Sequence, residues 1–375
     1  MSSLAVDVGG TFIKAAVIDD GQVGPVSRVS IPPFLDSSGE LGEPGHAREI
    51  DASALDAAVQ SVISAVTAGT DLDGRVFVSG QMAGIAFVEE SGEALAPLIS
   101  WQDTRYGDIE GVSAAIGPDD VIDLGDGLRV GSPVVTLASH KRPSGCHVTS
   151  LIAYVAGRIA GERATTVHAT DAASWGLFDT RKGSWSVSAC RVAGVEPDAL
   201  PGVASDVVPV VPGSGVRVAI ADQQAALVGA GLEPGWVSVN LATGCQVSVL
   251  SEGFSTSVQT RPYFDGRFLH TVTHLPAGRL LASALRSTRG SEDWEWLTTS
   301  GMELEAVDQV VQGIADAAGR LNAKEMPVLF TGGLVQQLPA LRERIAIELG
   351  ASAVRVFAGD DAALAGLATL AARER

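Results

Sequence analysis

Basic residues are scarce in this chain. Its 375 residues include 26 lysines and arginines against 44 aspartates and glutamates, which gives a formal net charge of -18 at pH 7. This acidity argues against a nucleic-acid backbone or an anionic membrane surface as the main partner, because both require a basic face. An anionic substrate stays compatible with the charge if local cations, backbone N–H groups or a metal ion meet it. Only four of the bases are lysines, and one of them, Lys14, follows a glycine-rich turn.

Cysteines and long apolar runs are also few. The three cysteines are widely spaced and form no Cys-x-x-Cys pair, which argues against both a disulfide framework and a zinc site. No apolar run approaches the roughly 18 residues that would span a bilayer, and Leu4–Val8 is too short for a secretory signal. We therefore predict a cytoplasmic protein without a membrane or nucleic-acid partner. The sequence leaves a homodimer open.

The two halves of the chain begin with a similar pattern. Leu4–Asp7 and Phe12–Ile18 are predicted strands joined by the tight turn Gly9–Thr11. The first half thus opens with a β-hairpin, whereas a dinucleotide or Walker fingerprint has a strand, a glycine loop and a helix. Trp236–Leu250 repeats the order of strand, polar turn and strand, and strands alternate with helices elsewhere, which favours mainly parallel α/β sheets. We predict an internal repeat and two domains: residues 1–232 and 233–375.

The first turn has the groups that a phosphate requires. Asp7 ends the first strand and Lys14 lies on the return strand, while Gly10 and Thr11 supply backbone N–H groups between them. A carboxylate in this place would hold Mg²⁺, usually through water. The alternative is an ordinary hairpin with a solvated lysine. The turn Thr243–Gly244 in the second half favours the phosphate hypothesis, since two such turns on opposite walls of a cleft suit a triphosphate.

A second pair of glycines lies near the C-terminus. Gly332 and Gly333 follow the strand predicted at residues 327–330, and a helix is predicted after them at 338–349. A glycine pair directly after a strand lets a flat ligand approach the backbone closely. The pattern therefore indicates a seat for a nucleotide.

Asp222 is the candidate for a catalytic base. It ends a strand predicted at residues 216–221 and precedes a helix predicted at 223–231. An aspartate in that position often caps the helix, which is worth about 1 kcal/mol. A carboxylate there can also take a proton from a hydroxyl that attacks the γ-phosphate of ATP. Position alone favours the cap, but one carboxylate can serve both purposes.

Two polar clusters, Gln81–Met82 and Trp101–Arg105, are candidates for binding a sugar. Both follow predicted strands, and they flank an apolar segment. Sugars bind to aromatic faces and to planar polar side chains that hold pairs of hydroxyls, and Trp101, Gln102 and Asp103 supply both kinds of group. The alternative is a buried tryptophan beside a surface pair of Asp and Arg.

Together these segments resemble the FGGY carbohydrate kinases of the actin-like ATPase superfamily. The matching segments follow the family's order and cover both halves. They are Val6–Thr11 with Lys14, Ser79–Met82, Trp101–Arg105, Ala221–Ala226, Asn240–Gly244, Thr331–Gly333 and Asp361–Gly366. Other segments resemble the sedoheptulokinase branch of the family: Asp171–Asp179 with Trp185, Arg261–Phe264 and Leu275–Gly278. Each match is weak alone, and the combination is strong.

The resemblance implies a fold and a reaction. The fold would be α/β, with two actin-like (ribonuclease H-like) domains around a central cleft. The reaction would be the ATP- and Mg²⁺-dependent phosphorylation of a ketose at its terminal hydroxyl, with sedoheptulose or a similar ketose as the expected substrate. The implied roles are Asp222 as catalytic base in contact with the sugar; Gln81, Met82, Trp101, Gln102, Asp103 and Arg105 as sugar ligands; Gly10, Thr11, Lys14, Thr243, Gly244, Gly332, Gly333 and Gln336 at the nucleotide; and Asp7 and Asp222 at the metal ion.

Three departures from the family pattern keep other functions open. Ala83 stands where ketose kinases often have a histidine, and Ala221 replaces the glycine that usually precedes the base. The interval from Gly244 to Gly332 is short, which leaves the completeness of the nucleotide site open. Glycerol is disfavoured as a substrate because Met82 and Ala83 replace an arginine and a glutamate of glycerol kinase. The alternatives are a xylulokinase, a ribulokinase or another polyol kinase, and a non-catalytic sugar or nucleotide sensor on the same fold.

Overall fold

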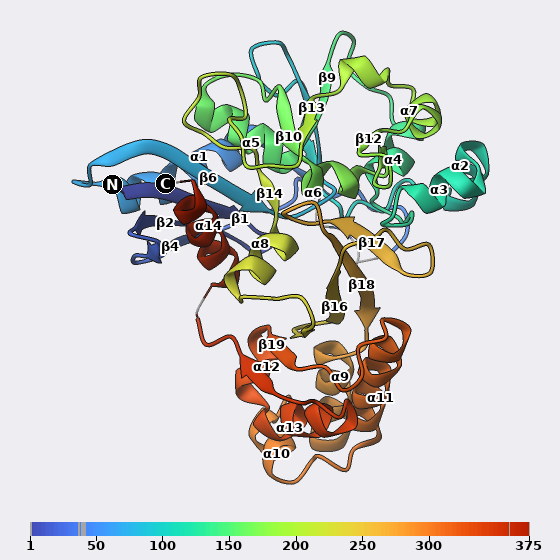
Figure 1. Ribbon diagram of the computed structural model, residues 1–375. Coiled ribbons are helices and arrows are strands. Elements are labelled where there is room, and N and C mark those ends of the chain that lie inside the picture. The colour runs from blue at the N-terminus through green and yellow to red at the C-terminus, as the bar shows by residue number, and fades with distance from the viewer. Residues whose placement is uncertain (1, 37, 39–42, 360, 375) are drawn as a thin grey trace. The chain divides into compact units, whose positions relative to one another are not determined.

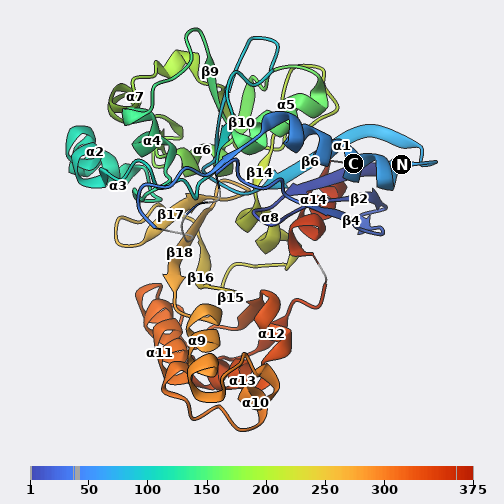
Figure 2. The same cartoon turned by 180° about the vertical axis from the view of Figure 1, so that it is seen from behind.

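The structure is a computed structural model that describes residues 2–36, 38, 43–359 and 361–374. The chain forms two compact units, which Figure 1 shows from one side and Figure 2 from behind. The first unit comprises Met1–Gly229, Pro262–Gly266 and Asp361–Arg375, and the second comprises Ala230–Arg261 and Arg267–Asp360. The last helix and the loop at 262–266 thus group with the first unit, although the sequence-based division places both after residue 232. No helix in the described part of the chain is long and apolar enough to cross a membrane.

The main sheet of the first unit is built around the predicted hairpin. Its strands follow the order β14-β6-β1-β2-β3, with β4 also paired to β2. The strands are β1 Ser2–Val8, β2 Phe12–Asp19, β3 Gln22–Val23, β4 Ser27–Ser30, β6 Leu72–Gly80 and β14 Ile220–Ala221. β1 pairs antiparallel with β2 and parallel with β6, and β6 pairs parallel with β14. The carboxyl ends of β1, β6 and β14 therefore meet at one edge of the sheet.

Helices from both ends of the chain pack on this sheet. The helix α1 (Ala52–Thr67) begins at Asp51, whose side chain accepts the N–H of Ala54, and it buries Leu55, Val59 and Val62 at helical spacing against the sheet. The helix α14 (Ala362–Arg373) contacts β1 and β6, and it crosses α8 (Asp222–Gly229). Glycines permit that crossing. An added Cβ on Gly366 would lie 1.9 Å from the carbonyl oxygen of Ala225, and one on Gly229 would lie 2.0 Å from that of Ala362.

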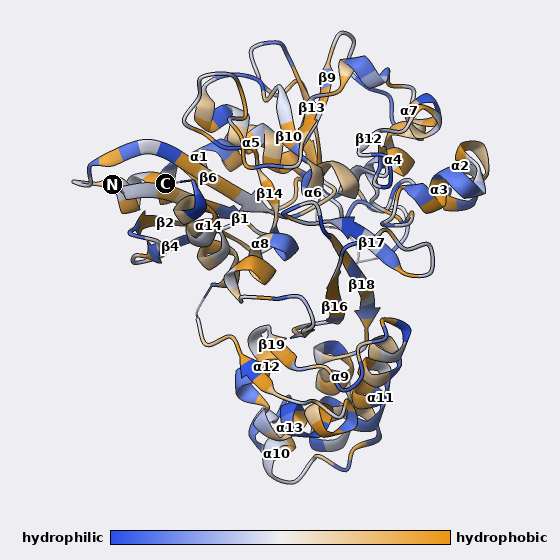
Figure 3. Cartoon of the chain, viewed as in Figure 1, coloured by the Kyte–Doolittle hydropathy of each residue, from blue (hydrophilic) through white to orange (hydrophobic). Residues whose placement is uncertain are grey.

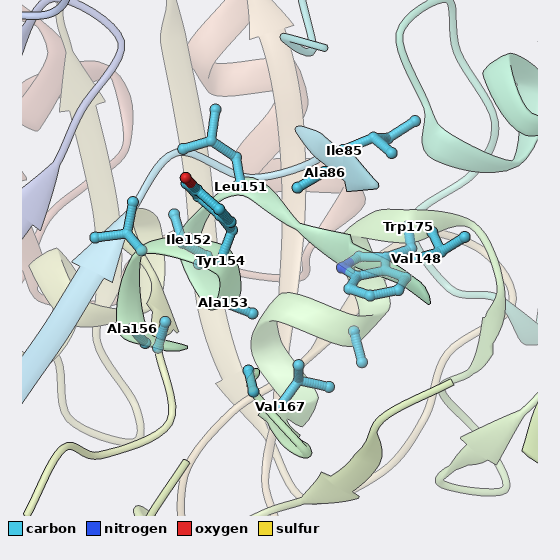
Figure 4. Packing of buried hydrophobic residues seen from close by; sticks show 14 of the residues in the cluster. Ile85, Ala86, Val148, Leu151, Ile152, Ala153, Tyr154, Ala156, Val167 and Trp175 are labelled. Atoms are coloured by element: carbon cyan, nitrogen blue, oxygen red, sulfur yellow. The ribbon is translucent and has the colours of Figure 1, made fainter. Parts of the chain in front are cut away.

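The rest of the first unit surrounds a four-stranded sheet with the order β5-β8-β7-β9. Its core includes Leu151, Ile152 and Tyr154 of α5 and the fully buried Trp175, which Figure 4 shows at close range. The further elements of this unit are β5 Glu49–Ile50, β7 Ile85–Val88, β8 Leu98–Ile99, α2 Ile109–Ile116, α3 Pro118–Asp123, α4 Pro133–Ser139, β9 His147–Ser150, α5 Leu151–Ala160, β10 Thr166–His168, α6 Ala169–Ala172, β11 Phe178–Asp179, β12 Ser184–Trp185, α7 Val187–Ala193, β13 Gly202–Ala204 and the 3₁₀ helices Ala173–Trp175 and Pro197–Ala199.

The second unit repeats the strand order of the first. Its sheet has the order β17-β18-β16-β15-β19-β20, in which β15 pairs antiparallel with β16 and parallel with β19, and β19 pairs parallel with β20. A central hairpin followed by two parallel strands is thus common to both units, which confirms two similarly built α/β halves. The strands are β15 Val237–Leu241, β16 Cys245–Ser251, β17 Gln259–Pro262, β18 Phe268–Leu275, β19 Val328–Thr331 and β20 Val354–Val356.

Five helices accompany this sheet: α9 Gly278–Arg289, α10 Trp294–Thr299, α11 Glu305–Arg320, α12 Gly333–Gln337 and α13 Pro339–Glu348. The helix α11 packs on β16 and β18 with the buried side chains Val307, Val310 and Ile314, which recur every three or four residues. Figure 3 shows hydrophilic and hydrophobic colours together on this helix, as expected when one face is buried and the other meets solvent.

The strand predicted at residues 216–221 is shorter than expected. Only Ile220 and Ala221 pair with β6 as a strand. Val216 forms a single bridge to Val76, and Arg217 forms one to Pro209. The short strand still delivers Asp222 to the edge where β1 and β6 end.

Candidate active site

Three neighbouring parallel strands deliver polar side chains to the same edge of the first sheet. In the β1–β6 register Asp7 lies opposite Ser79, and in the β14–β6 register Ala221 lies opposite Gly80. Asp222 and Gln81 are the next residues along their strands. Gln81 and Asp222 are therefore level with each other, on strands about 4.8 Å apart, and Asp7 lies two residues earlier along β1. We refer to these three residues near the ends of neighbouring strands as the row.

Asp7 is a buried carboxylate with two side-chain partners. Its side chain accepts the Ser79 hydroxyl at 2.8 Å through Oδ1 and lies 3.4 Å from Lys14 Nζ through Oδ2. Only 3% of Asp7 is exposed, and this burial raises the pKa of Asp7, although the Lys14 ammonium acts in the opposite direction. A desolvated carboxylate at a strand end is a suitable oxygen donor for a hard cation.

Lys14 lies between two carboxylates. Its Nζ is 2.6 Å from Asp361 Oδ2 as well as 3.4 Å from Asp7 Oδ2. Burial acts to lower the pKa of Lys14, but Asp7 and Asp361 together raise it, so the ammonium stays charged. Asp361 also accepts the N–H of Leu364 and so caps α14. The predicted phosphate contact of Lys14 therefore stays a prediction, while its pairing with Asp361 is a contact that the sequence did not indicate.

The turn between β1 and β2 is open to solvent at Gly10 and Thr11. The N–H of Gly9 closes the turn by donating to Phe12 O at 3.0 Å, and an added Cβ on Gly9 would lie only 3.1 Å from that oxygen. An added Cβ on Gly10 would lie 3.8 Å from Gln81 Oε1, in ordinary contact. The turn therefore presents exposed backbone close to the Gln81 side chain, and its binding of a phosphate stays a prediction.

The loop that carries Gln81 and Met82 is held by hydrogen bonds from its backbone N–H groups. Gln81 is 5% exposed and its N–H donates to Val8 O at 2.8 Å, but its buried Nε2 has no hydrogen-bond partner among the described residues. Ala83 has a φ of 64°, a left-handed conformation that a residue with a Cβ seldom adopts. The N–H of Ala83 donates to Ser174 Oγ at 3.0 Å. An unpartnered buried amide beside a strained residue is typical of a ligand site.

The second cluster, Trp101–Arg105, is tied to the same loop through the small sheet. Ile99 of β8 pairs with Ile85 of β7. Gln81–Met82 comes shortly before β7 and Trp101–Arg105 shortly after β8, so the two clusters flank neighbouring strands. Trp101 is 40% exposed, which leaves its ring accessible to a sugar face. The N–H of Gln102 donates to Ser100 Oγ.

Asp103 is engaged entirely within the protein. Its side chain has no exposed surface, and it accepts the guanidinium of Arg105 at 2.8 Å and the N–H of Arg48 at 2.9 Å. Arg105 also pairs with Glu49 at 2.6 Å, and these carboxylates raise its pKa further above the usual range against the effect of burial. Asp103 thus orients Arg105, and a direct contact of Asp103 with a sugar gains no support from this arrangement.

Asp222 is the first residue of α8 and is half-buried. Its Oδ1 accepts the N–H of Gln223 at 2.7 Å. The carboxylate thus lies at the start of the helix, but it bonds to the next N–H and not to the N–H two or three residues ahead that a capping side chain bonds. The row with Asp7 and Gln81 is what distinguishes Asp222 from an ordinary capping residue.

The predicted turns of the second unit also follow neighbouring parallel strands of their sheet. Asn240 of β15 lies opposite Thr331 of β19, so the exposed turn Thr243–Gly244 and the pair Gly332–Gly333 follow neighbouring strands. Gly332 has a φ of 96°, and an added Cβ there would lie 2.2 Å from Leu241 O and 2.5 Å from Asn240 Oδ1. Only glycine fits this position. Gln336, further along α12, is exposed, and its Nε2 lies 3.5 Å from Phe357 O.

The arrangement of the chain resembles known kinases in sequence and in fold. No protein-family model matches it. It is 25% identical to sedoheptulokinase of Homo sapiens over 81% of this chain and 71% of that enzyme, and 25% identical to a glycerol kinase of Cereibacter sphaeroides over 74% and 59%. Gluconate kinase from Lactobacillus acidophilus superposes with a TM-score of 0.82 at 16% identity, covering 99% of this chain and 89% of that one. Ligand-bound xylulose kinase from the same organism gives 0.80 at 16% identity, covering 100% and 90%.

In sequence and in fold the chain is thus similar to the FGGY carbohydrate kinases. The family resemblance found in the sequence is thereby confirmed, and so is the α/β fold with two actin-like domains. The relatives are named kinases of several different acceptors, so the comparisons support a carbohydrate kinase without settling which sugar this one uses.

Some groups of this candidate site were missing from the sequence-based assignment. Ser79, Glu49 and Asp361 bond to Asp7, Arg105 and Lys14, respectively. Their only sequence signal is their position next to a motif or a helix start. In the second unit, Asn240 Oδ1 and Gln246 Oε1 are buried without a hydrogen-bond partner in the described part of the chain. Both belong to the hairpin that carries Thr243, which makes them candidates for ligand contacts.

The described part of the chain does not form a metal centre by itself. The described residues contain no group of three or more His, Cys, Asp or Glu side chains placed to hold a metal ion. The two predicted metal ligands, Asp7 and Asp222, belong to the same row. Two side chains are fewer than the three or more of a preformed site. Their role at Mg²⁺ stays a prediction.

Proposed function

We propose that this FGGY kinase transfers the γ-phosphoryl group of ATP to the terminal hydroxyl of a ketose, with sedoheptulose or a similar ketose as its substrate. The observation that carries the proposal is the row of Asp7, Gln81 and Asp222 at the carboxyl ends of three neighbouring parallel strands. Ligands of open α/β sheets bind at such edges. The row supplies a carboxylate for proton transfer, an amide for hydroxyls and a carboxylate for a cation.

Asp222 would act as the general base. Phosphoryl transfer needs an acceptor hydroxyl that is in line with the γ-phosphate and that loses its proton as the new bond forms. A half-buried carboxylate fixed at the first residue of a helix can receive that proton. The bond between sugar oxygen and phosphorus forms, the bond between the γ-phosphorus and the bridging oxygen breaks, ADP leaves, and the proton passes to Asp222.

The sugar would lie against the loop at Gln81–Met82 and the cluster at Trp101–Arg105. The Nε2 of Gln81, which has no hydrogen-bond partner among the described residues, can donate to a hydroxyl. The exposed side chain of Trp101 can stack on a sugar, and Gln102 and Arg105 belong to the same segment of the chain. Asp103 would contribute by fixing the direction of Arg105, since its own carboxylate is buried against that guanidinium.

ATP and Mg²⁺ fit the groups that are present. The exposed backbone of Gly10 and Thr11, with Lys14 behind it, suits a phosphate, and the hairpin turn Thr243–Gly244 suits a second one. Gly332, Gly333 and Gln336 would serve the adenosine part. Mg²⁺ is commonly bound by one or two carboxylates together with substrate phosphates, so Asp7 and Asp222 suffice as protein ligands. The ion would neutralise charge on the phosphates. Such a reaction belongs in the cytoplasm, where ATP is supplied.

The choice of a ketose rests on the relatives and on residues of the loop. Sedoheptulokinase is among the curated relatives, and Met82 and Ala83 replace the arginine and glutamate that favour glycerol. Xylulose is the second candidate, because xylulose kinases share the fold over the whole chain. A non-catalytic sensor is disfavoured by the retention of Asp7, Lys14 and Asp222.

The test is a coupled ADP-release assay with glycerol, xylulose, ribulose, gluconate and sedoheptulose as acceptors. We expect the highest kcat/KM with sedoheptulose, and we expect Asp222→Asn to lose more than about 100-fold in kcat while still binding ATP. Asp108→Asn is the matched control, because Asp108 also accepts a helix N–H but lies at α2. ADP release that is independent of any acceptor, or an Asp222→Asn enzyme with the kcat of wild type, would overturn the proposal.

A further inference from the structure

A chain of buried hydrogen bonds leads from a histidine to the residue before Asp222. His168 is the last residue of β10 and has no exposed surface. Its Nδ1 lies 2.8 Å from Thr170 Oγ1, and Thr170 Oγ1 accepts the N–H of Ala221 at 3.2 Å. Ala221 ends β14, and Asp222 begins α8 directly after it. The histidine has no part in the proposed chemistry; its Nδ1 also accepts the backbone N–H of Thr170 at 3.2 Å and so caps α6.

The direction of these hydrogen bonds follows from the far side of the imidazole. His168 Nε2 lies 3.1 Å from the carbonyl oxygen of Ser205, which can only accept, so Nε2 carries the proton. Burial lowers the pKa of His168 to about 4, so the ring is neutral at neutral pH and Nδ1 is unprotonated. Nδ1 then accepts from Thr170, whose hydroxyl oxygen is left to accept the N–H of Ala221.

The strand β14 needs this support because it is very short and lies at the edge of its sheet. Only Ile220 and Ala221 pair with β6, and no strand lies on the other side of β14 in the sheet order. Ala221 is fully buried, so its N–H would be costly to leave without an acceptor. The Thr170 hydroxyl takes the place that a carbonyl of a neighbouring strand would have.

A second contact holds the same histidine and the same helix from another direction. The ring of Phe264 lies 5.3 Å from the ring of His168, and the Nε2 of Gln224 donates to Pro262 O at 3.3 Å. Gln224 belongs to the first turn of α8. The start of α8 is thus held both by the loop at 262–266 and by the pair of His168 and Thr170.

We propose that His168 and Thr170 are positioning residues for Asp222, which hold the Ala221 amide and thereby fix the carboxylate at the end of the row. This inference rests on the proposed function, because it takes Asp222 as the base. Neither residue touches the reacting atoms. The expected consequence is an effect on kcat that exceeds any effect on the binding of sugar or ATP.

The first test compares Thr170→Val with Thr170→Ser. Valine keeps the shape but removes the acceptor for Ala221, so kcat should fall about tenfold, as the loss of one buried hydrogen bond allows, with KM values for sugar and ATP within about twofold. Serine keeps the hydroxyl and should retain kcat within about threefold. His168→Phe keeps an aromatic ring against Phe264 but removes Nδ1, and it should resemble Thr170→Val.

Thr180→Val is the matched control. The Thr180 hydroxyl is also buried in this unit and donates to a backbone carbonyl, that of Leu124, at 2.8 Å. Its loss should lower Tm without changing kcat. If Thr170→Val and Thr180→Val lower Tm alike and both keep the kcat of wild type, Thr170 is merely structural and the proposal is overturned.

Hydrogen exchange of the peptide spanning residues 219–227 supplies a readout that needs no turnover. We expect faster exchange there in Thr170→Val than in Thr180→Val or wild type, and equal exchange in all three would overturn the anchoring of Ala221. If wild type releases no ADP with any sugar but Thr170→Val still shows faster exchange, the proposed function fails while the anchor is established. The two failures are therefore distinguishable.

Discussion

The carboxylate of Asp171 should make the first unit less stable as the pH rises from about 4 to about 7. Asp171 has no exposed surface, and it accepts the hydroxyl of Ser150 at 2.6 Å and the indole N–H of Trp175 at 3.3 Å. Burial raises the pKa of Asp171 from its ordinary value of 3.8 to about 7, because these two hydrogen bonds offset only part of the desolvation. The folded state therefore keeps its proton over a pH range in which the unfolded state has released it.

The sign and size of the effect follow from proton linkage. Between pH 4 and pH 7 the folded state binds one more proton than the unfolded state, so the free energy of unfolding falls as the pH rises. Each tenfold change in proton affinity corresponds to about 1.4 kcal/mol, so the loss reaches about 4 kcal/mol by pH 7. Above pH 7 both states are ionised and the loss stays constant.

Asp171→Asn is the perturbation that isolates this group. An asparagine resembles the protonated acid: its oxygen can accept from Trp175 and its amide can donate to Ser150, whose hydroxyl already accepts the N–H of Ala153. The variant should therefore lack the pH-dependent loss. Urea unfolding at pH 5, 6, 7 and 8, followed by hydrogen exchange of residues 151–157 in α5, would report on this unit. We expect the advantage of Asp171→Asn over wild type to grow by about 1.4 kcal/mol with each pH step up to about 7.

The control is a carboxylate whose pKa is changed in the opposite direction. Hydrogen bonds from Ser53 and Ala54 hold the pKa of the exposed Asp51 below its usual value. Asp51→Asn should therefore differ from wild type by a constant amount between pH 5 and pH 8, because the Asp51 carboxylate is ionised in the folded and the unfolded state throughout that range, whereas the difference for Asp171→Asn grows. A constant difference between Asp171→Asn and wild type from pH 5 to pH 7 would refute the assignment of a raised pKa to Asp171.

Two further substitutions test the nucleotide turn and the lysine pair. Gly332→Ala would place a Cβ 2.2 Å from Leu241 O at a φ of 96°, so it should destabilise the second unit by roughly 1–3 kcal/mol and weaken ATP binding in calorimetry. Gly333→Ala, with open space around its Cβ, is the control for Tm. An unchanged Tm in Gly332→Ala would contradict the crowding. Asp361→Asn should keep the cap on α14 but remove the 2.6 Å pair with Lys14, and urea unfolding should show a loss of about 1–2 kcal/mol because both groups are largely buried. The exposed pair of Asp308 and Arg344 provides the control, since Asp308→Asn should cost less than about 0.5 kcal/mol. Equal losses in the two variants would argue against a buried ion pair.

Local patterns made the hairpins and their turns predictable. The strands at Leu4–Asp7 and Phe12–Ile18, the glycine turn between them and the similar hairpin at residues 236–250 follow from alternation and turn chemistry over a few residues. The helix starts are also local, because Asp51 and Asp361 bond to N–H groups three residues ahead. The site motifs could be placed because each lies directly after a strand.

Several partners of the site residues were not predictable, because they lie far away along the chain. Asp103 is a sugar ligand by sequence pattern, yet in the structure it bonds to the amide of Arg48, which lies 55 residues earlier, as well as to the nearby Arg105. Nothing in the sequence around Lys14 indicates its pairing with Asp361, which lies near the other end of the chain. The left-handed Ala83 has no local signal either, since its conformation is held by Ser174.

The sequence by itself determined the two repeated hairpins, the glycine turns and the carboxylate at the start of α8, because each depends on residues within one turn or one strand pair. Only the tertiary structure decided that the last helix joins the first unit, where Gly366 and Gly229 let α14 and α8 approach closely. It alone also decided that Asp7, Gln81 and Asp222 share one sheet edge. The physical reason is the same in both cases: strand order and helix crossing depend on packing between segments that are distant in sequence, and no pattern within either segment encodes the partner.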